Sequence, residues 1–116
     1  MQGSDLFRLG HMLDAALHIQ KVSSQRTRFD IEYDDELPYA LMALFQILGE
    51  AARNVSPELK REHPEIEWSK IIGMRNKLAH GYFDIDYDLM WDIVRLQIPQ
   101  LITRLEPLVD QLKLGF

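Results

Sequence analysis

The chain has 116 residues, of which 47% are hydrophobic and 27% charged, and these proportions indicate a single folded domain over residues 1–116. It contains no cysteine, which excludes a disulfide scaffold, a cysteine-ligated metal site and a thiol nucleophile. The formal net charge of −5 argues against nucleic-acid binding through bulk positive charge, but it permits a small local site.

The sequence shows neither a membrane span nor an export signal. Its apolar runs are far shorter than the roughly 20 residues that a membrane-spanning helix needs. Its first residues lack the basic head and apolar core of a secretory leader. We therefore expect a cytoplasmic protein that does not engage a membrane.

The first half of the chain predicts two long helices joined by an acidic loop. Ser4 is a candidate N-cap for the first helix, and the polar run 23–28 ends it. Acidic residues are concentrated in 30–36, where we expect a loop. Pro38 suits the first turn of the next helix. Apolar residues then recur as far as Val55 over so broad a face that this helix should be covered on two sides.

The second half predicts one short helix and two longer ones. The Ser-Pro pair at 56–57 can cap and start the short helix, and the His-Pro pair at 63–64 ends it. A third main helix covers about 66–81 and stops at a glycine. A fourth starts after Asp86, and Pro99 should kink or split it. Since each apolar stripe must be covered by another helix, we predict an all-α antiparallel bundle of four to five helices.

The octet 75–82, Arg-Asn-Lys-Leu-Ala-His-Gly-Tyr, contains the best candidates for catalytic side chains. If the helix ends at Gly81, His80 lies in its last turn and Tyr82 just beyond it. A guanidinium, an imidazole, a carboxamide and a phenol then share one surface. Arg75 can grip two phosphate oxygens and stabilise the added charge of a five-coordinate transition state. His80 can take or give a proton near neutral pH.

These groups suit RNA cleavage without a metal ion. The nucleophile is the 2′-hydroxyl of the substrate, and removal of its proton leads to a 2′,3′-cyclic phosphate and a free 5′-hydroxyl. Whether His80 is the base, the acid or both stays open. We assign Asn76, Lys77 and Tyr82 to substrate binding. Glu50 can orient the arginine as a supporting carboxylate, or it can lie at the edge of the core.

Two plainer interpretations compete with a catalytic one. A histidine near the C-terminal end of a helix is favoured by the helix dipole when it is protonated. Arg75 can also pair with Glu50 or with another carboxylate on a neighbouring helix. An arginine and a histidine five residues apart are weakly specific by themselves, so the residues alone leave these interpretations open.

A longer stretch carries a family resemblance. Arg75 to Tyr82 fits the pattern Arg-x4-His-x-Tyr. The same family resemblance extends to four further segments, 47–52, 64–68, 71–74 and 81–87. From about residue 4 to residue 112, the chain resembles the HEPN superfamily and, within it, the HepT-type toxins.

The resemblance implies a small helical domain that forms a homodimer, with the arginine and histidine of both chains facing one cleft. It implies a metal-independent endoribonuclease without a cofactor, the toxic half of a type VII-like toxin–antitoxin pair, with Arg75 and His80 as the catalytic pair. It also implies a partner, the minimal nucleotidyltransferase MntA, which silences the toxin by transferring AMP to the motif tyrosine, here Tyr82. Further assembly of dimers stays open. The alternative is an inactive HEPN interaction module that binds nucleotide or a nucleotidyltransferase.

Charge is unevenly distributed along the chain. Segment 53–80 holds six Lys or Arg residues against four acidic residues, so RNA can be gripped locally there. The acidic stretch 30–36 is a candidate contact for a basic partner, although acidic loops are more often plain solvated surface.

One group of side chains resembles a metal site. His11, Asp14 and His18 share a face of the first helix in principle. Two imidazoles and one carboxylate on a single exposed helix seldom bind a metal, so we predict no metal site.

Overall fold

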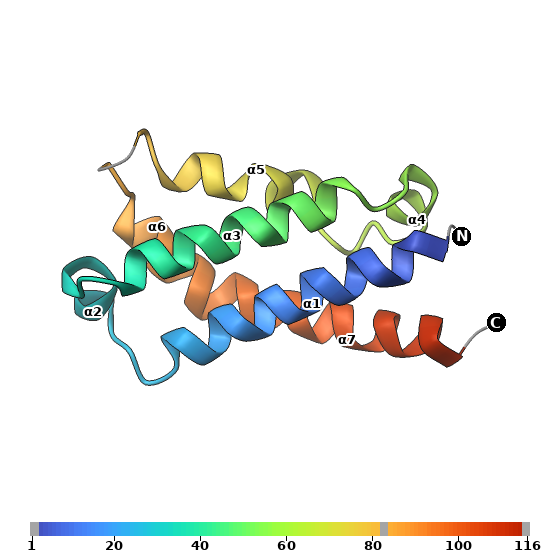
Figure 1. Ribbon diagram of the computed structural model, residues 1–116, viewed down its shortest axis with the longest axis horizontal. Helices are drawn as coiled ribbons and strands as arrows, with labels where there is room; N and C mark the ends of the chain where they lie inside the picture. The colour runs from blue at the N-terminus through green and yellow to red at the C-terminus, as the bar shows by residue number, and fades with distance from the viewer. Residues whose placement is uncertain (1–2, 82–83, 115–116) are drawn as a thin grey trace.

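Helices dominate the part of the chain that the computed structural model describes, residues 3–81 and 84–114 (Figure 1). The long segments are α1 (Gly3–Ser23), α3 (Leu37–Arg53), α5 (Trp68–Leu78) and a continuous run of α6 (Tyr87–Asp92), η1 (Ile93–Gln97) and α7 (Ile98–Leu114). Two short helices, α2 (Arg28–Tyr33) and α4 (Pro57–Glu62), lie in the connections. The described residues contain no strand, so the predicted all-α fold is confirmed.

The long helices lie side by side in the order α5, α3, α1 and α7, and neighbours run in opposite directions (Figure 1). As predicted from its broad apolar face, α3 is covered on two sides, by α1 and by α5. Fully buried side chains hold these helices together, among them Leu9, Met12, Phe45, Leu48 and Ile98. In the ranges given above, none of the helices is long and apolar enough to cross a membrane.

The acidic stretch 30–36 is not the plain loop that we predicted, because it contains most of α2. The Asp30 N–H donates to the Thr27 hydroxyl at 3.2 Å, and the Thr27 N–H donates to the Asp30 carboxylate at 2.9 Å. This reciprocal pair is a capping box, which satisfies two amides that the start of a helix otherwise leaves without partners. The short spacing between Thr27 and Asp30 was the signal for a helix that the acidic composition concealed.

The start of the chain also differs from the prediction. Since α1 already includes Gly3, Ser4 lies inside the helix and is not its N-cap. The next residue, Asp5, is fully buried and accepts hydrogen bonds from the Ser56 N–H at 2.9 Å and the Ser56 hydroxyl at 2.6 Å. Ser56 is itself the predicted cap of α4. The start of α1 is thereby tied to the connection between α3 and α5.

The last helical run changes geometry just before Pro99. The Ile98 N–H bonds to the carbonyl of Ile93, five residues earlier, which makes Ile93–Gln97 a π-helical segment. A proline has no N–H and its ring crowds the preceding turn, and the wider π turn accommodates it. The irregularity predicted near Pro99 is therefore present as a π-helical segment, but the helical run is not split there. The ribbon changes direction between α6 and α7 (Figure 1).

The end of α5 comes earlier than predicted, at Leu78 instead of Gly81. Ala79 is extended and forms an isolated antiparallel bridge with Ile85. The Asp86 N–H donates to the Leu78 carbonyl at 2.7 Å, so the chain returns to the helix that it has just left. Gly81 has a φ of 103°, a left-handed conformation that a side chain would disfavour. Asp86 then caps α6, as predicted.

Candidate functional site

Arg75 lies in the last turn of α5, where it borders a polar hollow between α5 and α3. Polar side chains from both helices line this hollow: Gln46, Glu50 and Arg53 from α3, and Asn76 from α5. The Arg75 side chain forms no hydrogen bond or ion pair with any residue that the structure describes. Within residues 3–81 and 84–114, this half-buried guanidinium therefore has donors that a ligand can use.

A second, apolar hollow lies on the other side of Arg75. Its other lining residues are Tyr39, Met42, Ala79, Gly81 and Ile85. Because Arg75 borders both hollows, one guanidinium stands where a polar surface meets an apolar one. An RNA nucleotide presents the same combination, a charged phosphate beside an aromatic base.

The polar hollow depends on the close approach of α3 to α5. A Cβ atom at Gly49 would lie 3.3 Å from the Ile72 carbonyl oxygen and 3.4 Å from that of Ile71. These contacts are with backbone carbonyl oxygens, which cannot move away by changing rotamer as a side chain can. Gly49 therefore sets the distance between the two walls at the polar hollow.

His80 lies two residues beyond the end of α5, and not in its last turn as we predicted. Its N–H donates to the Asp84 carbonyl at 3.0 Å, and its ring is exposed. The residues on either side of it, Ala79 and Gly81, line the apolar hollow. Since the effect of a helix dipole falls off beyond the last turn, the dipole is a weaker explanation for His80 than the sequence suggested.

The other predicted residues of the octet differ in position. Asn76 lines the polar hollow together with Arg75. Lys77 is exposed and lines neither hollow, because it is two residues from Arg75 and thus about 200° away around the helix. The structure therefore does not bring Lys77 together with Arg75. Tyr82 lies outside the described residues, and its assignment stays a prediction.

Glu50 faces the same hollow as Arg75, but its hydrogen bonds are with other groups. It accepts from the Gln46 amide at 3.3 Å and from the Arg53 guanidinium at 3.4 Å. A pair between Arg75 and Glu50, one of the plainer interpretations, is thus absent from the described contacts. Glu50 positions Arg53 and Gln46 directly.

Helix α3 contributes more to the site than the sequence indicated, since only Glu50 was predicted from it as a supporting residue. Tyr39, Gln46 and Arg53 also line the two hollows, and none of them was predicted as a site residue, although Arg53 belongs to the positively charged segment 53–80. Their spacing of seven residues is the available signal, since residues seven apart return to the same face of a helix. The apolar stripe of α3 drew attention to its buried side and away from this edge.

The three potential metal ligands on α1 do not form a site. His11, Asp14 and His18 line a shallow hollow between α1 and α3, together with Leu44 and Ile47. Over residues 3–81 and 84–114, no group of three or more His, Asp or Glu side chains is arranged to hold a metal ion.

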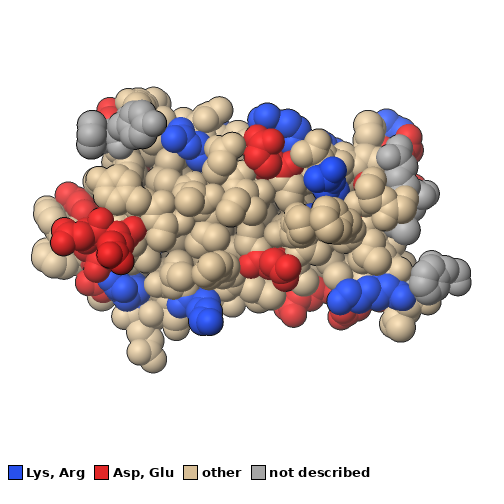
Figure 2. Space-filling model, viewed as in Figure 1, with Lys and Arg blue, Asp and Glu red and all other residues tan. Residues whose placement is uncertain are grey.

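Acidic side chains gather over α2, at one end of the molecule (Figure 2). The Thr27 N–H lowers the pKa of the Asp30 carboxyl, and the N–H groups of Leu37 and Glu36 lower the pKa of Asp34. Backbone donors therefore stabilise these carboxylates in their charged form. We call this region, residues 26–36 around α2, the α2 corner.

Comparison with known proteins shows which family this chain resembles. Residues 12–108 match the model of a family described as "Ribonuclease HepT-like". A protein of Thermococcus cleftensis named "Probable ribonuclease HepT" is 38% identical over 79 residues, which are 68% of this chain and 72% of that protein. A "Putative RNase" of Caldanaerobacter subterraneus subsp. tengcongensis is 32% identical over 84 residues, covering 72% of this chain and 75% of that protein. No solved structure gives a significant match.

Proposed function

Because the chain belongs to the HepT-like ribonuclease family, we propose that it is an endoribonuclease whose active site is the end of α5. The observation that carries this proposal is the Arg75 guanidinium, which lies between two hollows without a partner among the described residues, five residues before an exposed histidine. An unpaired, half-buried cation is costly for a fold and suits a site that binds an anion.

In the proposed reaction, Arg75 binds the oxygens of the scissile phosphate. His80 accepts the proton of the 2′-hydroxyl, whose oxygen attacks phosphorus as the bond to the 5′-oxygen breaks. The leaving oxygen takes up a proton, so the products are a 2′,3′-cyclic phosphate and a 5′-hydroxyl. Arg75 stabilises the charge that builds up on the phosphate oxygens in the transition state. No metal ion is required for these steps.

We further propose that the active form is a homodimer. Phe7 on α1 is 59% exposed and Ile47 on α3 is 52% exposed, so both helices present a large apolar side chain to solvent. Ile47 lines shallow hollows between α1 and α3, and Gln46 and Glu50 border both one of these and the polar hollow. An interface on this face would adjoin the site. Two-fold symmetry would then supply a second Arg75 and a second histidine, so that one cleft has both a base and an acid.

The regulatory part of the proposal concerns Tyr82. As a HepT-type toxin, the protein would be silenced when an MntA-like nucleotidyltransferase transfers AMP to this residue. The test is incubation with a cognate nucleotidyltransferase and ATP, followed by mass spectrometry. The wild type should gain the mass of AMP and Tyr82→Phe should not. A Tyr82→Phe protein that is still modified contradicts the assignment.

The ribonuclease proposal is tested by digestion of single-stranded RNA in the presence of EDTA. We expect cleavage to continue in chelator and the new ends to be cyclic phosphates and 5′-hydroxyls. Cleavage that stops in EDTA, or that leaves 5′-phosphate ends, would refute the metal-independent mechanism. An intact substrate at all metal concentrations would favour the alternative, an inactive HEPN interaction module.

A further inference from the structure

We propose that α3 carries two RNA-binding subsites on either side of Arg75, a phosphate subsite at Arg53 and a base-stacking subsite at Tyr39. The proposal rests on the ribonuclease function above and specifies its substrate as single-stranded RNA with nucleotides bound on both sides of the scissile phosphate. Neither residue lies in the octet, and each belongs to a different hollow.

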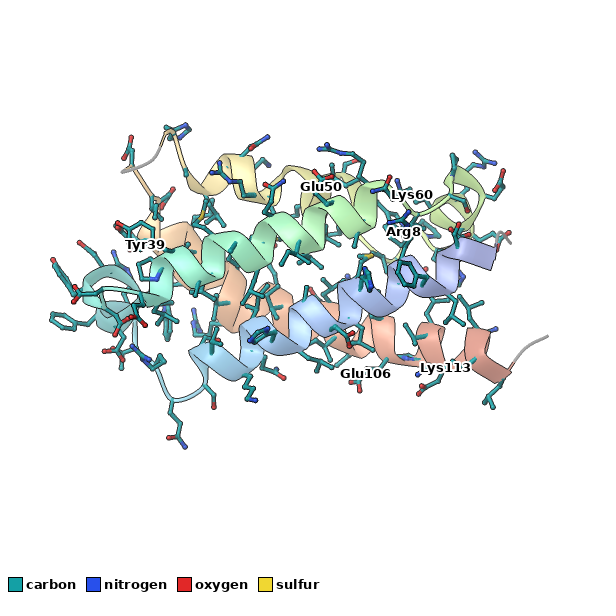
Figure 3. All side chains as sticks on the ribbon, viewed as in Figure 1. Arg8, Tyr39, Glu50, Lys60, Glu106 and Lys113 are labelled. Atoms are coloured by element: carbon teal, nitrogen blue, oxygen red, sulfur yellow. The ribbon has the colours of Figure 1, made fainter. Side chains whose placement is uncertain are left out.

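The two subsites lie on one edge of α3. Residues that line the two hollows recur on this helix every three or four positions, in the order Tyr39, Met42, Gln46, Gly49 and Arg53. Such spacing places them on the side of α3 that faces α5. The fourteen-residue separation of the outer two corresponds to about 21 Å along the helix. Figure 3 shows Tyr39 near the start of α3 and Glu50 toward its other end.

Arg53 is suited to bind a phosphate because its guanidinium forms only one weak, exposed ion pair among the described residues, with Glu50. It bonds to Glu50 at 3.4 Å, and the Arg53 and Glu50 side chains are 57% and 50% exposed. An exposed ion pair contributes little free energy, so a phosphate can share or replace the carboxylate. The Lys60 ammonium donates to the Arg53 carbonyl at 3.2 Å, which places a second positive charge at this end.

Tyr39 is suited to a base. It is 53% exposed although it borders the apolar hollow, so one part of its surface is available to a ligand. Single-stranded RNA is commonly bound by stacking of an unpaired base on an aromatic side chain. The acidic residues gathered over the adjoining α2 repel phosphate from the apolar hollow beside Tyr39. The charge distribution therefore assigns the base to Tyr39 and the phosphate to Arg53.

The test is binding of a fluorescent, mixed-sequence 2′-O-methyl oligoribonucleotide, which cannot be cleaved by attack of a 2′-hydroxyl. We expect Tyr39→Ala to weaken binding about tenfold and Tyr39→Phe to keep it, because stacking needs the ring and not the hydroxyl. The matched control is Tyr33→Ala, which removes another exposed tyrosine, 63% exposed, on α2.

For the phosphate subsite, binding is measured over a range of salt concentrations. Arg53→Ala should weaken binding and reduce the slope of log affinity against log salt by about one, since one phosphate contact is lost. The matched control is Arg95→Ala, because Arg95 forms a similar exposed ion pair, with Asp92 at 3.7 Å. Arg53→Lys should keep the salt slope.

The outcomes separate this proposal from the one on which it rests. If the wild type cleaves RNA while Tyr39→Ala and Arg53→Ala bind as tightly as their controls, the subsites are wrong and the ribonuclease function stands. If the two variants lose binding as expected but the wild type cleaves no RNA, the subsites stand and the ribonuclease function is wrong.

Discussion

At the α2 corner, Arg26 bonds to Asp34 at 2.8 Å and lies 3.5 Å from Asp30, and both carboxylates also accept backbone N–H groups. At the end of α5, in contrast, Arg75 and the His80 ring have no hydrogen-bond or ion-pair partner among the described residues. Both regions are polar and both follow a main helix closely. At the α2 corner, the charged side chains bond to each other and to nearby backbone N–H groups. At the end of α5, the Arg75 guanidinium borders two hollows and has no such partner among the described residues.

The difference shows why charge density is a poor guide to a site. Segment 30–36 is the most densely charged part of the sequence, yet its carboxylates are largely engaged in capping and ion pairs. The octet 75–82 is less charged, but its described polar side chains are not used by the fold. Binding capacity follows from donors and acceptors that the fold leaves unsatisfied.

The largest effect is expected where the two walls of the site touch. Gly49→Val should lower the free energy of unfolding by about 1–3 kcal/mol, because the new side chain meets the backbone of α5. Cleavage should fall as well, since the walls of the polar hollow must move apart. The measurements are urea unfolding followed by circular dichroism and an RNA cleavage assay.

The control for this variant is Gly73→Val. Gly73 is also a helical glycine, but a Cβ there meets nothing within 4 Å. The control should therefore unfold at nearly the wild-type urea concentration and cleave RNA normally. Equal behaviour of the two variants would contradict the role given to the close approach of α3 and α5.

A smaller effect, confined to stability, is expected at the α2 corner. The pKa of Asp34 is lowered chiefly by the Leu37 N–H, so its charged form stabilises the fold above the pKa of the unfolded chain, about 4, and this stability is lost as the pH falls through the folded pKa. Asp34→Asn should therefore lower stability at pH 7, and its difference from wild type should shrink below pH 4 or so. Cleavage should be unchanged.

Unfolding measured from pH 7 to pH 2 or so gives this comparison, with Asp35→Asn as the control. The Asp35 carboxylate has no partner in the described part of the chain, so its removal should leave the pH dependence unaltered. A difference for Asp34→Asn that persists at acid pH, or an equal effect of the control, would mean that the corner is not held by its charged carboxylate.

Most of the bundle could be predicted from the sequence, because long helices are specified by local patterns. The apolar periodicity identified the main helices, and Ser56 and Asp86 identified two of the caps. Pro99 identified the irregularity in the last helical run. These signals act over a few residues, so they can be read without knowledge of the fold.

Apart from α2, whose local capping box was overlooked, the errors arose where the pairing of segments or the rotamers of side chains decide the structure. Helix α5 ends at Leu78, where Asp86 bonds to the Leu78 carbonyl and Ile85 forms a bridge with Ala79, and Gly81 alone suggested a later end. The α3 wall of the site depends on which edge of α3 faces α5, which periodicity does not reveal. Glu50 was recognised as a polar residue near the site, but its bonds to Gln46 and Arg53 depend on rotamers.

The most direct test compares RNA cleavage and unfolding in Arg75→Ala, His80→Ala and Arg26→Ala. We predict that the first two lose cleavage by about 100-fold or more while their unfolding free energy changes by less than about 0.5 kcal/mol. Arg26→Ala should keep cleavage, because its charge serves the α2 corner. Full cleavage by Arg75→Ala or His80→Ala would contradict the assignment of the end of α5 as the active site.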